Sequence, residues 1–398
     1  MGGELVLKKL NILDQETIKK INKKNILQLL YKKNQLTKQE ISNALHISIP
    51  TVISNVNELI EEGYLDEAGV AESTGGRKPI IVRYLPEARY SFGVSVTSNK
   101  IRIALVNLKL DIIKEEEFEL SEEHQSVDIL MDNIKECIDT IVYDFKIPND
   151  KIIGVGFSLP GTVNEEKLIL GNAPNLKLKN IEFKKYETKY NYKFYIENEA
   201  NAAAYAETFL NLDNVVKNLV FVSITGGIGA GIMINGNLYK GHNKRAGEFG
   251  HMTIVKNGQQ CNCGKKGCWE LYASERALMK QYNQEFNSTD KSMKEFFRLT
   301  RINEKAKNIL YNYINYLAEG IKNVILITDP EEVIIGGKIA YYEEYFKELL
   351  IMKVFEENSF YTKGDCKLSF SKLKSNASIL GAALMTMQEI FFINKKIM

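Results

Sequence analysis

The sequence lacks several features that would decide its class at once. Its 398 residues contain no run of about 18 consecutive apolar residues, which excludes a membrane-spanning helix. The N-terminus has no signal-peptide core and no small-residue cleavage site, which predicts a cytoplasmic protein. There are only five cysteines, and a reducing compartment disfavours a disulfide framework. The net charge of +2 is too small to indicate nucleic-acid binding by the chain as a whole.

Charge is nevertheless distributed unevenly. Residues 1–57 contain nine lysines against four acidic residues, Glu4, Asp14, Glu16 and Glu40. This local excess of positive charge predicts an N-terminal segment whose partner differs from that of the remaining chain.

The segment "LTKQEISNALHISIPTVISNVNELIEEGYL" (residues 36–65) predicts two helices joined by a tight turn. Thr37 and Glu40 form a capping box, and Ser48 is a good N-cap for the second helix. An earlier helix carrying Ile26 and Leu30 would complete a three-helix core. After Gly63, two strand-like runs flank a glycine-rich tip, which is the pattern of a wing.

The short polar face of the second helix is suited to base edges and phosphates, and Arg77 and Lys78 on the wing tip are suited to phosphates or a narrow minor groove. A helical module without DNA contacts, with Arg77 and Lys78 as solvated loop charges, is the alternative. The predicted DNA-binding residues are Ser48, Pro50, Thr51, Ser54, Asn55, Arg77 and Lys78.

From Tyr90 onward, strand-like and helix-like segments alternate. We expect three antiparallel strands within residues 90–120, a helix over 127–145 and a strand at "KIIGVGFSL". A second series repeats the theme with the strand "NLVFVSIT", the turn "GGIGAG" and the strand "GIMING". The pattern predicts an α/β architecture of two similar lobes with a cleft between them. "TGGIGAG" (225–231) could cradle a phosphate, or its glycines could serve a tight strand connection.

The stretch "GHMTIVKNGQQCNCGKKGCWE" (250–270) has the spacing H-x9-C-x-C-x4-C. One imidazole and three thiolates complete a tetrahedral zinc shell and leave no position for substrate, so the motif predicts a structural zinc site. Its ligands are His251, Cys261, Cys263 and Cys268. Cys137 and Cys366 lie outside the motif and are expected to be ordinary buried residues.

Carboxylates surround this motif in the sequence. Glu248 and Glu270 flank the predicted ligands, and an ion tying the loop together would bring both near His251, as acceptors suited to a polyol. Further upstream, "IENEANAAAYAE" places Asn198 and Glu199 between a strand and an alanine-rich helix. Stabilisation of the helix dipole is the alternative explanation for Glu199.

Together, "AGEFGHMTIVKNGQQCNCGKKGCWE", "IENEANAAA", "GFSLPGTVN" and "ITGGIGAGIMINGNLYKG" resemble the ROK family of sugar kinases and sugar-responsive repressors. The resemblance runs from about residue 88 to the C-terminus and implies an actin-like, two-lobed sugar-kinase-type fold. Repressor members add an N-terminal winged helix. We therefore expect a winged helix-turn-helix domain at 1–85 and a sugar-binding domain at 86–398.

The resemblance also implies residues for the sugar site. The hydroxyl groups would be held by Gly161, Asn198, Glu199, Glu248, His251 and Glu270. His251 would bind zinc through one ring nitrogen and offer the other toward the sugar.

Two departures from the kinases of the family argue against catalysis. Kinases have an Asp-x-Gly-Gly-Thr phosphate loop, whereas this chain has "GVSVTSNK", with Ser95, Thr97, Ser98 and Asn99 at those positions. Glu199 replaces the aspartate that acts as general base, and its longer side chain misplaces the carboxylate for in-line attack.

The sequence therefore predicts no enzyme but a homodimeric repressor that binds double-stranded operator DNA and responds to a monosaccharide, with xylose and glucose as the leading candidates. A sugar kinase that retains ATP-dependent phosphorylation of a hexose is the alternative. A docking scaffold controlled by partner proteins is a third possibility.

Overall fold

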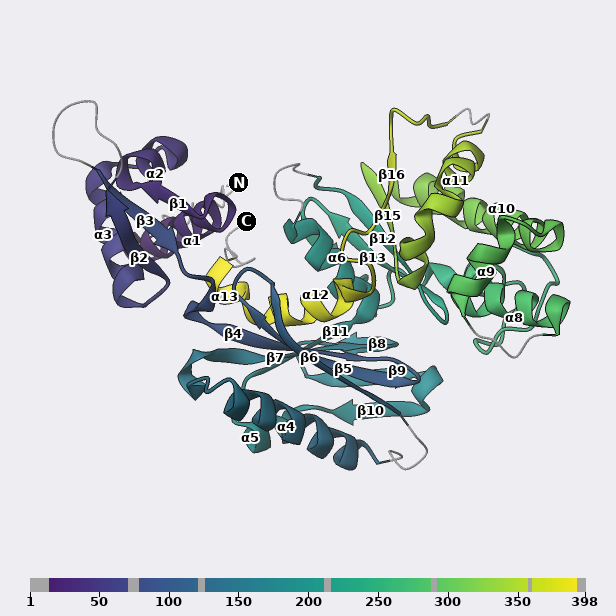
Figure 1. The fold of residues 1–398 in the computed structure, drawn as a ribbon, viewed down its shortest axis with the longest axis horizontal. Helices are drawn as coiled ribbons and strands as arrows, with labels where there is room; N and C mark the ends of the chain where they lie inside the picture. Colours follow the sequence, from purple (N-terminus) through teal and green to yellow (C-terminus); the bar gives the residue numbers. More distant parts are fainter. Residues whose placement is uncertain are drawn as a thin grey trace, which may run out of the picture.

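The computed structural model describes residues 14–70, 79–120, 126–210, 216–287, 292–356 and 360–391. None of the helices in these ranges is long and apolar enough to cross a membrane. The N-terminal portion forms a winged helix, at the upper left of Figure 1. Its elements are α1 (Gln15–Lys33), β1 (Gln35–Thr37), α2 (Lys38–Leu45), α3 (Ile49–Glu61), β2 (Leu65–Val70) and β3 (Ile80–Tyr84).

Local sequence accounts for this portion. Thr37 and Glu40 form the predicted capping box at α2, and the Ser48 hydroxyl accepts a hydrogen bond from the backbone N–H of Thr51 at the start of α3. Ile26 and Leu30 of α1 are fully buried, as expected for the three-helix core. Strands β2 and β3 form the antiparallel wing, and β1, which the sequence did not reveal, pairs with the other edge of β3.

Two lobes with the same sheet topology follow. The first contains β4 (Tyr90–Val96), β5 (Lys100–Asn107), β6 (Ile112–Glu119), α4 (Val127–Asp144), β7 (Ile152–Leu159), β8 (Thr162–Asn164), β9 (Ile169–Ala173), β10 (Leu178–Glu182), α5 (Lys184–Tyr190) and β11 (Phe194–Asn198). The second contains β12 (Leu219–Ile224), β13 (Ile228–Ile234), β14 (Asn237–Tyr239), α7 (Glu270–Ala273), α8 (Glu275–Phe286), α9 (Met293–Thr300), α10 (Glu304–Thr328), β15 (Glu332–Gly336), α11 (Lys347–Val354) and β16 (Lys367–Phe370).

The strand orders show the duplication. They are β6-β5-β4-β7-β11 in the first lobe and β14-β13-β12-β15-β16 in the second. In each lobe the first three strands are antiparallel, the fourth pairs in parallel with the first, and the fifth pairs in parallel with the fourth. The predicted pair of similar lobes is therefore confirmed, as are the three antiparallel strands and the helix near 127–145. The strand predicted after "GGIGAG" begins earlier, at Ile228, so the turn is shorter than expected.

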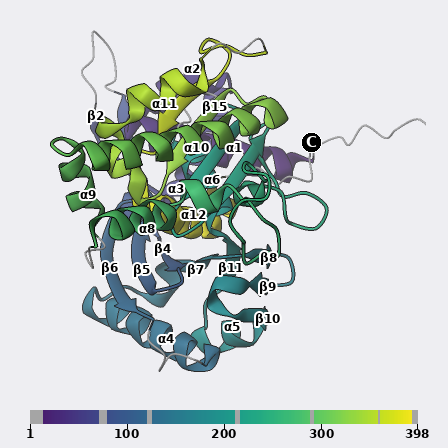
Figure 2. The same cartoon turned by 90° about the vertical axis from the view of Figure 1, so that its right-hand side faces the viewer.

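Two helices lie between the lobes, α6 (Glu199–Leu210) and α12 (Ala377–Thr386), and α13 (Gln388–Phe391) follows α12. Figures 1 and 2 show α12 on the inner face of the first sheet, with α4 and α5 covering its outer face. Close approach requires glycine here, because a Cβ on Gly156 of β7 would lie 1.9 Å from the backbone oxygen of Ala382 in α12. The core of the second lobe forms between its sheet and α8–α11.

Candidate functional site

The four predicted metal ligands converge in the second lobe. One ligand atom from each of His251, Cys261, Cys263 and Cys268 lies within 4.8 Å of all the others. Cys263 Sγ and Cys268 Sγ are 3.6 Å apart, and Cys261 Sγ is 3.7 Å from His251 Nδ1. Metal–sulfur bonds of about 2.3 Å in a tetrahedron place two sulfurs about 3.8 Å apart, so the cluster fits a small tetrahedral cation.

The loop that carries these ligands is held to the core of the lobe. Gly267 has φ +78°, and a Cβ there would lie 1.7 Å from the Val255 oxygen, so the turn requires glycine. Beside it, Trp269 is fully buried, and its indole N–H donates to the backbone oxygen of Tyr316 in α10. The cluster is therefore built on a rigid base.

Carboxylates border the cluster on both sides, as expected. Glu270 Oε1 lies 3.3 Å from Cys261 Sγ and 3.6 Å from His251 Nδ1, while Glu248 Oε2 lies 3.8 Å from His251 Nε2. The two ring nitrogens of His251 thus face different partners, one the thiols and one Glu248. Glycine at position 227 leaves room for Glu270, because a Cβ there would lie 2.7 Å from Glu270 Oε2.

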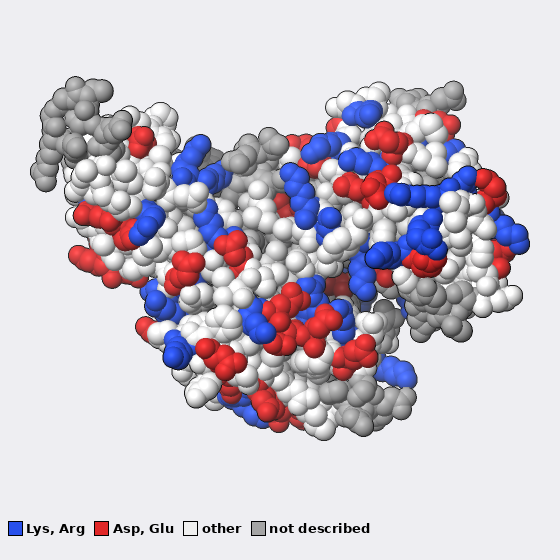
Figure 3. Space-filling view, viewed as in Figure 1, with Lys and Arg blue, Asp and Glu red and all other residues white. Residues whose placement is uncertain are grey.

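The first lobe contributes a second group of predicted residues. Asn198 Nδ2 donates to the Gly161 oxygen at 2.9 Å, while Asn198 Oδ1 accepts from the backbone N–H groups of Ala200 and Asn201 and so caps α6. Gly161 follows β7 and Asn198 ends β11, which are neighbouring parallel strands, so both lie at the carboxyl edge of the first sheet. Figure 3 shows a recess in the molecular surface between the two lobes.

Glu199 links the two groups electrostatically. It is the first residue of α6, and burial together with the charge of Glu248 raises the pKa of Glu199 to about 7. Burial likewise raises the pKa of Glu248, and the negative charge of Glu270 raises it further. The structure thus brings together Gly161 with Asn198, and Glu248 with His251 and Glu270, and places Glu199 within electrostatic reach of the second set.

The raised pKa of Glu199 predicts that stability falls with increasing pH. Between its ordinary value of 4.5 and about 7, the folded chain keeps a proton that the unfolded chain has lost, so raising the pH through this window favours unfolding. The loss attributable to Glu199 is on the order of 2–3 kcal/mol. Thermal melting of the sugar-free protein from pH 5 to 8 should show it, and Glu199→Gln should flatten the slope. The exposed substitution Glu166→Gln should not, and an equal slope in Glu199→Gln would contradict the assignment.

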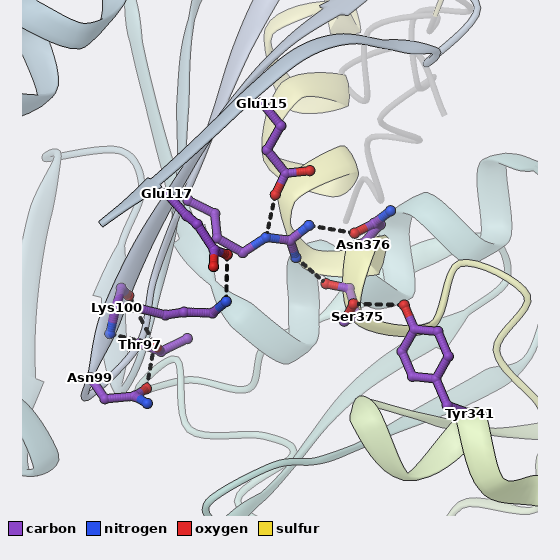
Figure 4. A network of polar contacts seen from close by, with 9 residues as sticks. Thr97, Asn99, Lys100, Glu115, Glu117, Tyr341, Ser375 and Asn376 are labelled. Atoms are coloured by element: carbon purple, nitrogen blue, oxygen red, sulfur yellow. Dashed lines mark hydrogen bonds and ion pairs between the residues drawn. The ribbon is translucent and has the colours of Figure 1, made fainter. Parts of the chain in front are cut away.

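The polar groups of the turn between β4 and β5 are occupied by hydrogen bonds to one another and to neighbouring residues. Kinases of the family that the sequence resembles have a phosphate loop at this position. The backbone N–H of Thr97 donates to the Lys100 oxygen at 2.9 Å, and the Thr97 hydroxyl accepts from the backbone N–H of Lys100 at 3.2 Å. The Asn99 oxygen accepts from the backbone N–H of Leu120, and Lys100 pairs with Glu117. Figure 4 shows these side chains turned toward one another.

A polar network beside this turn joins the two lobes. Arg102 of β5 donates to Glu115 Oε1 at 2.5 Å, to the Ser375 backbone oxygen at 2.7 Å and to Asn376 Oδ1 at 2.5 Å. The Ser375 hydroxyl lies 3.0 Å from that of Tyr341, which belongs to the second lobe (Figure 4). Sequence reasoning missed this network, because its members are up to 274 residues apart.

A second missed network lies near Asn198. Lys240 Nζ is 2.7 Å from Glu165 Oε1 and also contacts Glu197, while Lys244 Nζ is 2.9 Å from the same Glu165 oxygen. Glu197 in turn accepts from the backbone N–H of Asn198. Lys240 therefore ties the second lobe to the strand that carries Asn198, and no local sequence signal indicates this.

One glycine of "TGGIGAG", Gly231, is required by close packing against α6. The turn is confined to residues 225–227, where the Thr225 N–H donates to the Gly227 oxygen. Gly231 lies within β13, and a Cβ there would be 2.4 Å from the Ala200 oxygen and 2.6 Å from the Ala204 Cβ. The motif therefore lets β13 approach α6 closely.

In the winged helix, most of the predicted face of α3 is confirmed as accessible. Ser48, Pro50 and Ser54 are exposed and Thr51 is half-buried. The prediction that Asn55 faces outward is wrong: Asn55 is buried, and its Nδ2 donates to the Thr51 oxygen at 2.7 Å. It lies at the border of the apolar face, where a helical wheel does not separate the two sides. Arg77 and Lys78 lie outside the described residues.

At least four of the N-terminal lysines are paired within the domain, including Lys20 with Glu16 and Lys38 with Glu67. Lys19 Nζ and Lys23 Nζ lie 2.5 and 2.8 Å from the carboxylate of Glu58, and Lys23 also pairs with Glu62. These acids belong to α3 and the residue that follows it. The positive charge available to a partner is therefore smaller than the composition of residues 1–57 indicates.

Comparisons with known proteins agree with both parts of the chain. A sequence model of the ROK family matches residues 91–389, and one of winged helix-turn-helix DNA-binding domains matches residues 20–66. The xylose repressor of Bacillus subtilis (strain 168) is 34% identical over 83% of this chain and 85% of its own length.

Solved structures show the same fold. A ROK family transcriptional regulator described as a homolog of the E. coli MLC protein has a TM-score of 0.77 at 23% identity and covers 94% of this chain and 97% of its own. A ROK family glucokinase from Streptomyces griseus has a TM-score of 0.63 at 23% identity and covers 75% of this chain and 99% of its own. The predicted two-lobed sugar-kinase-type fold with an N-terminal winged helix is confirmed.

Proposed function

Since this chain belongs to the ROK family, we propose that it is a transcriptional repressor that binds operator DNA through its winged helix and responds to a monosaccharide. The observation that carries the proposal is one hydrophobic core shared by the winged helix and the sugar-kinase-type domain. The similarity to a xylose repressor supports xylose as the effector, with glucose next. The domain boundary is placed at residue 85, between β3 and β4, and the protein acts in the cytoplasm as a homodimer on a palindromic site.

The cation in this proposal is zinc. Three thiolates and one imidazole are a preferred donor set for structural zinc, held here by His251, Cys261, Cys263 and Cys268. Bound there, zinc supplies a charge and a fixed geometry rather than a catalytic position. Its role is to fix His251 together with the neighbouring carboxylates of Glu248 and Glu270.

The sugar in this proposal occupies the space between the two groups of polar residues. Gly161 and Asn198 approach it from the first lobe, and Glu248, His251 and Glu270 from the second, with Glu199 between them. Carboxylates and a ring N–H offer acceptors and a donor to several hydroxyl groups. A ligand held from both lobes favours one lobe arrangement over others, which is the condition for an effector to shift an equilibrium.

The winged helix is directly connected to this site. Helix α6 begins at Glu199 and is 12 residues long, and near its other end Phe209 packs against Tyr31 of α1 with ring centroids 5.1 Å apart. Phe391 of α13 completes the cluster, 5.6 Å from Tyr31, and its backbone oxygen accepts from Gln28 of α1. Figure 1 shows α13 beside α1. Helix α6 therefore connects the proposed sugar-binding residues to the DNA-binding domain.

We also propose that this protein no longer catalyses phosphoryl transfer. The turn between β4 and β5 has no glycine, and its polar groups already bond to one another, to Leu120 and to Glu117, which leaves few groups to cradle a phosphate. Ser95, at the position of the kinase aspartate, is buried and lies 3.5 Å from the Ser378 hydroxyl. These contacts support a sensor derived from a kinase rather than a working kinase.

Operator binding that changes with sugar is the expected result. Duplexes are first selected from a random-sequence library by the purified protein and then titrated in gel shifts with xylose, glucose and N-acetylglucosamine. One sugar should change the operator affinity by about 5-fold or more, the usual lower range of allosteric coupling.

The control is the same protein and sugars with ATP and Mg²⁺ in a coupled assay, which should show no turnover. Sugar-dependent turnover of roughly 1–100 per second would establish a kinase instead. Operator affinity that is unchanged by every sugar would contradict the sensor proposal.

A further inference from the structure

The outward face of α3 forms a regular stripe. Pro50, Ile53, Ser54 and Asn57 are exposed and follow the i, i+3, i+4, i+7 spacing of one helix face. Ile53 is 40% exposed, although isoleucine is among the residues that are most often buried. The stripe therefore places a large apolar side chain at its centre.

The opposite face of α3 packs into the domain core and fixes the orientation of this stripe. Val52, Val56 and Leu59 are almost fully buried in the core of the winged helix, so α3 has little freedom to rotate. Asn55 is buried with them and does not contribute to the outward face. Of the amides on α3, only that of Asn57 faces outward, and Asn57 Oδ1 accepts from Lys38 Nζ at 3.2 Å. This contact leaves the Nδ2 group of Asn57 as a hydrogen-bond donor.

The chemistry of α3 narrows what it can recognise. The helix contains no Lys, Arg or His, so it cannot supply the Arg or Lys contact to guanine that is most common in specific complexes. Its second half carries Glu61, whose negative charge is repelled by phosphates, and Glu58, whose carboxylate is paired with Lys19 and Lys23. Its first half, with Ile53 and Ser54, is therefore the part suited to the major groove.

We propose that Ile53 recognises the 5-methyl group of a thymine in the major groove of double-stranded DNA. That methyl is the most prominent apolar group that a base pair presents there, and it suits contact with a branched aliphatic side chain that can form no hydrogen bond. Each operator half-site then contains an A·T pair at the position facing Ile53. The inference rests on the proposed function, because it requires operator binding by the winged helix.

The test removes the methyl group and nothing else. Starting from a duplex selected by the wild-type protein, each thymine is replaced in turn by deoxyuridine, and affinities are measured by gel shift. At one position in each half-site, deoxyuridine should weaken wild-type binding by about 3- to 10-fold, the range expected for one buried methyl group. The Ile53→Ala variant should bind the thymine duplex more weakly and lose nothing further with deoxyuridine.

A matched control is Ile18→Ala, because Ile18 of α1 is also exposed, at 44%, and lies in the same domain but off the stripe. This variant should keep the deoxyuridine sensitivity of the wild type, and thermal melting should show that both variants are folded. Equal sensitivity in Ile53→Ala, or no sensitive thymine at all, would refute the role of Ile53. Failure to select any duplex would instead refute operator binding itself, so the two failures are distinguishable.

Discussion

Replacing Cys263 by Ser is expected to release the cation and to weaken sugar binding by about 10- to 100-fold, the usual cost of disturbing the surroundings of a metal site. Serine keeps the size of the side chain but removes the thiolate that lies 3.6 Å from Cys268. His251 would then lose the geometry that fixes it between Glu248 and Glu270. Metal content by mass spectrometry and sugar titration by calorimetry measure the two effects.

The stability of this variant should fall as well. Ligands that are assembled only in the folded state convert the binding energy of the metal into folding energy, so the melting temperature should drop by several degrees. Zinc added to the wild type after chelation should restore both the melting temperature and the sugar affinity. Neither effect of zinc is expected in Cys263→Ser.

The matched control is Cys137→Ser, because Cys137 is half-buried in α4, outside the cluster. It should retain the metal and the sugar affinity of the wild type. If calorimetry found normal sugar binding in metal-free Cys263→Ser, the cation would hold only the loop, and its proposed role in positioning Glu248 and Glu270 would be wrong.

Features encoded by nearby residues were predictable from the sequence. The capping box of Thr37 and Glu40 and the N-cap Ser48 depend on contacts three residues apart. The four candidate metal ligands lie within eighteen residues, and glycines of that segment, such as Gly267, fix the turn independently of distant segments. The alternation of strands and helices likewise indicated two similar lobes, which the matching sheet orders confirm.

Features that depend on distant residues were not predictable. The partners of Arg102 and Lys240 come from other parts of the chain, so only the folded structure brings their charges together. Asn55 shows a second limit, because a residue at the edge of the apolar face can be buried or exposed, and the folded structure buries Asn55 with its Nδ2 donating to the Thr51 oxygen. The contact of Gln28 with Phe391 joins residues 363 apart and could not be expected from either segment.

Replacing Phe209 by Ala is expected to abolish most of the allosteric coupling between sugar binding and operator binding. Phe209 is almost fully buried between Tyr31 of α1 and Phe391 of α13, and its removal leaves a cavity where α6 meets the winged helix. Glu199, the proposed sugar-binding residue at the other end of α6, lies ten residues from Phe209, or about 15 Å along the helix. Sugar affinity and sugar-free operator affinity should therefore stay within about 3-fold of the wild type. The effect of sugar on operator affinity should fall below about 2-fold, out of the usual allosteric range.

The expected cost in stability is about 3–5 kcal/mol for Phe→Ala in a core, so Phe209→Leu provides a milder variant that should lose part of the coupling. Phe296→Leu is the control, because Phe296 is equally buried in an aromatic cluster of the second lobe, 5.4 Å from Tyr282 and away from the junction. It should lose stability but keep the response to sugar. If both Phe209 variants bound sugar and operator and still responded fully, the signal would have to pass through another contact, and the next to test is Lys109, whose Nζ lies 4.6 Å from the ring of Tyr31.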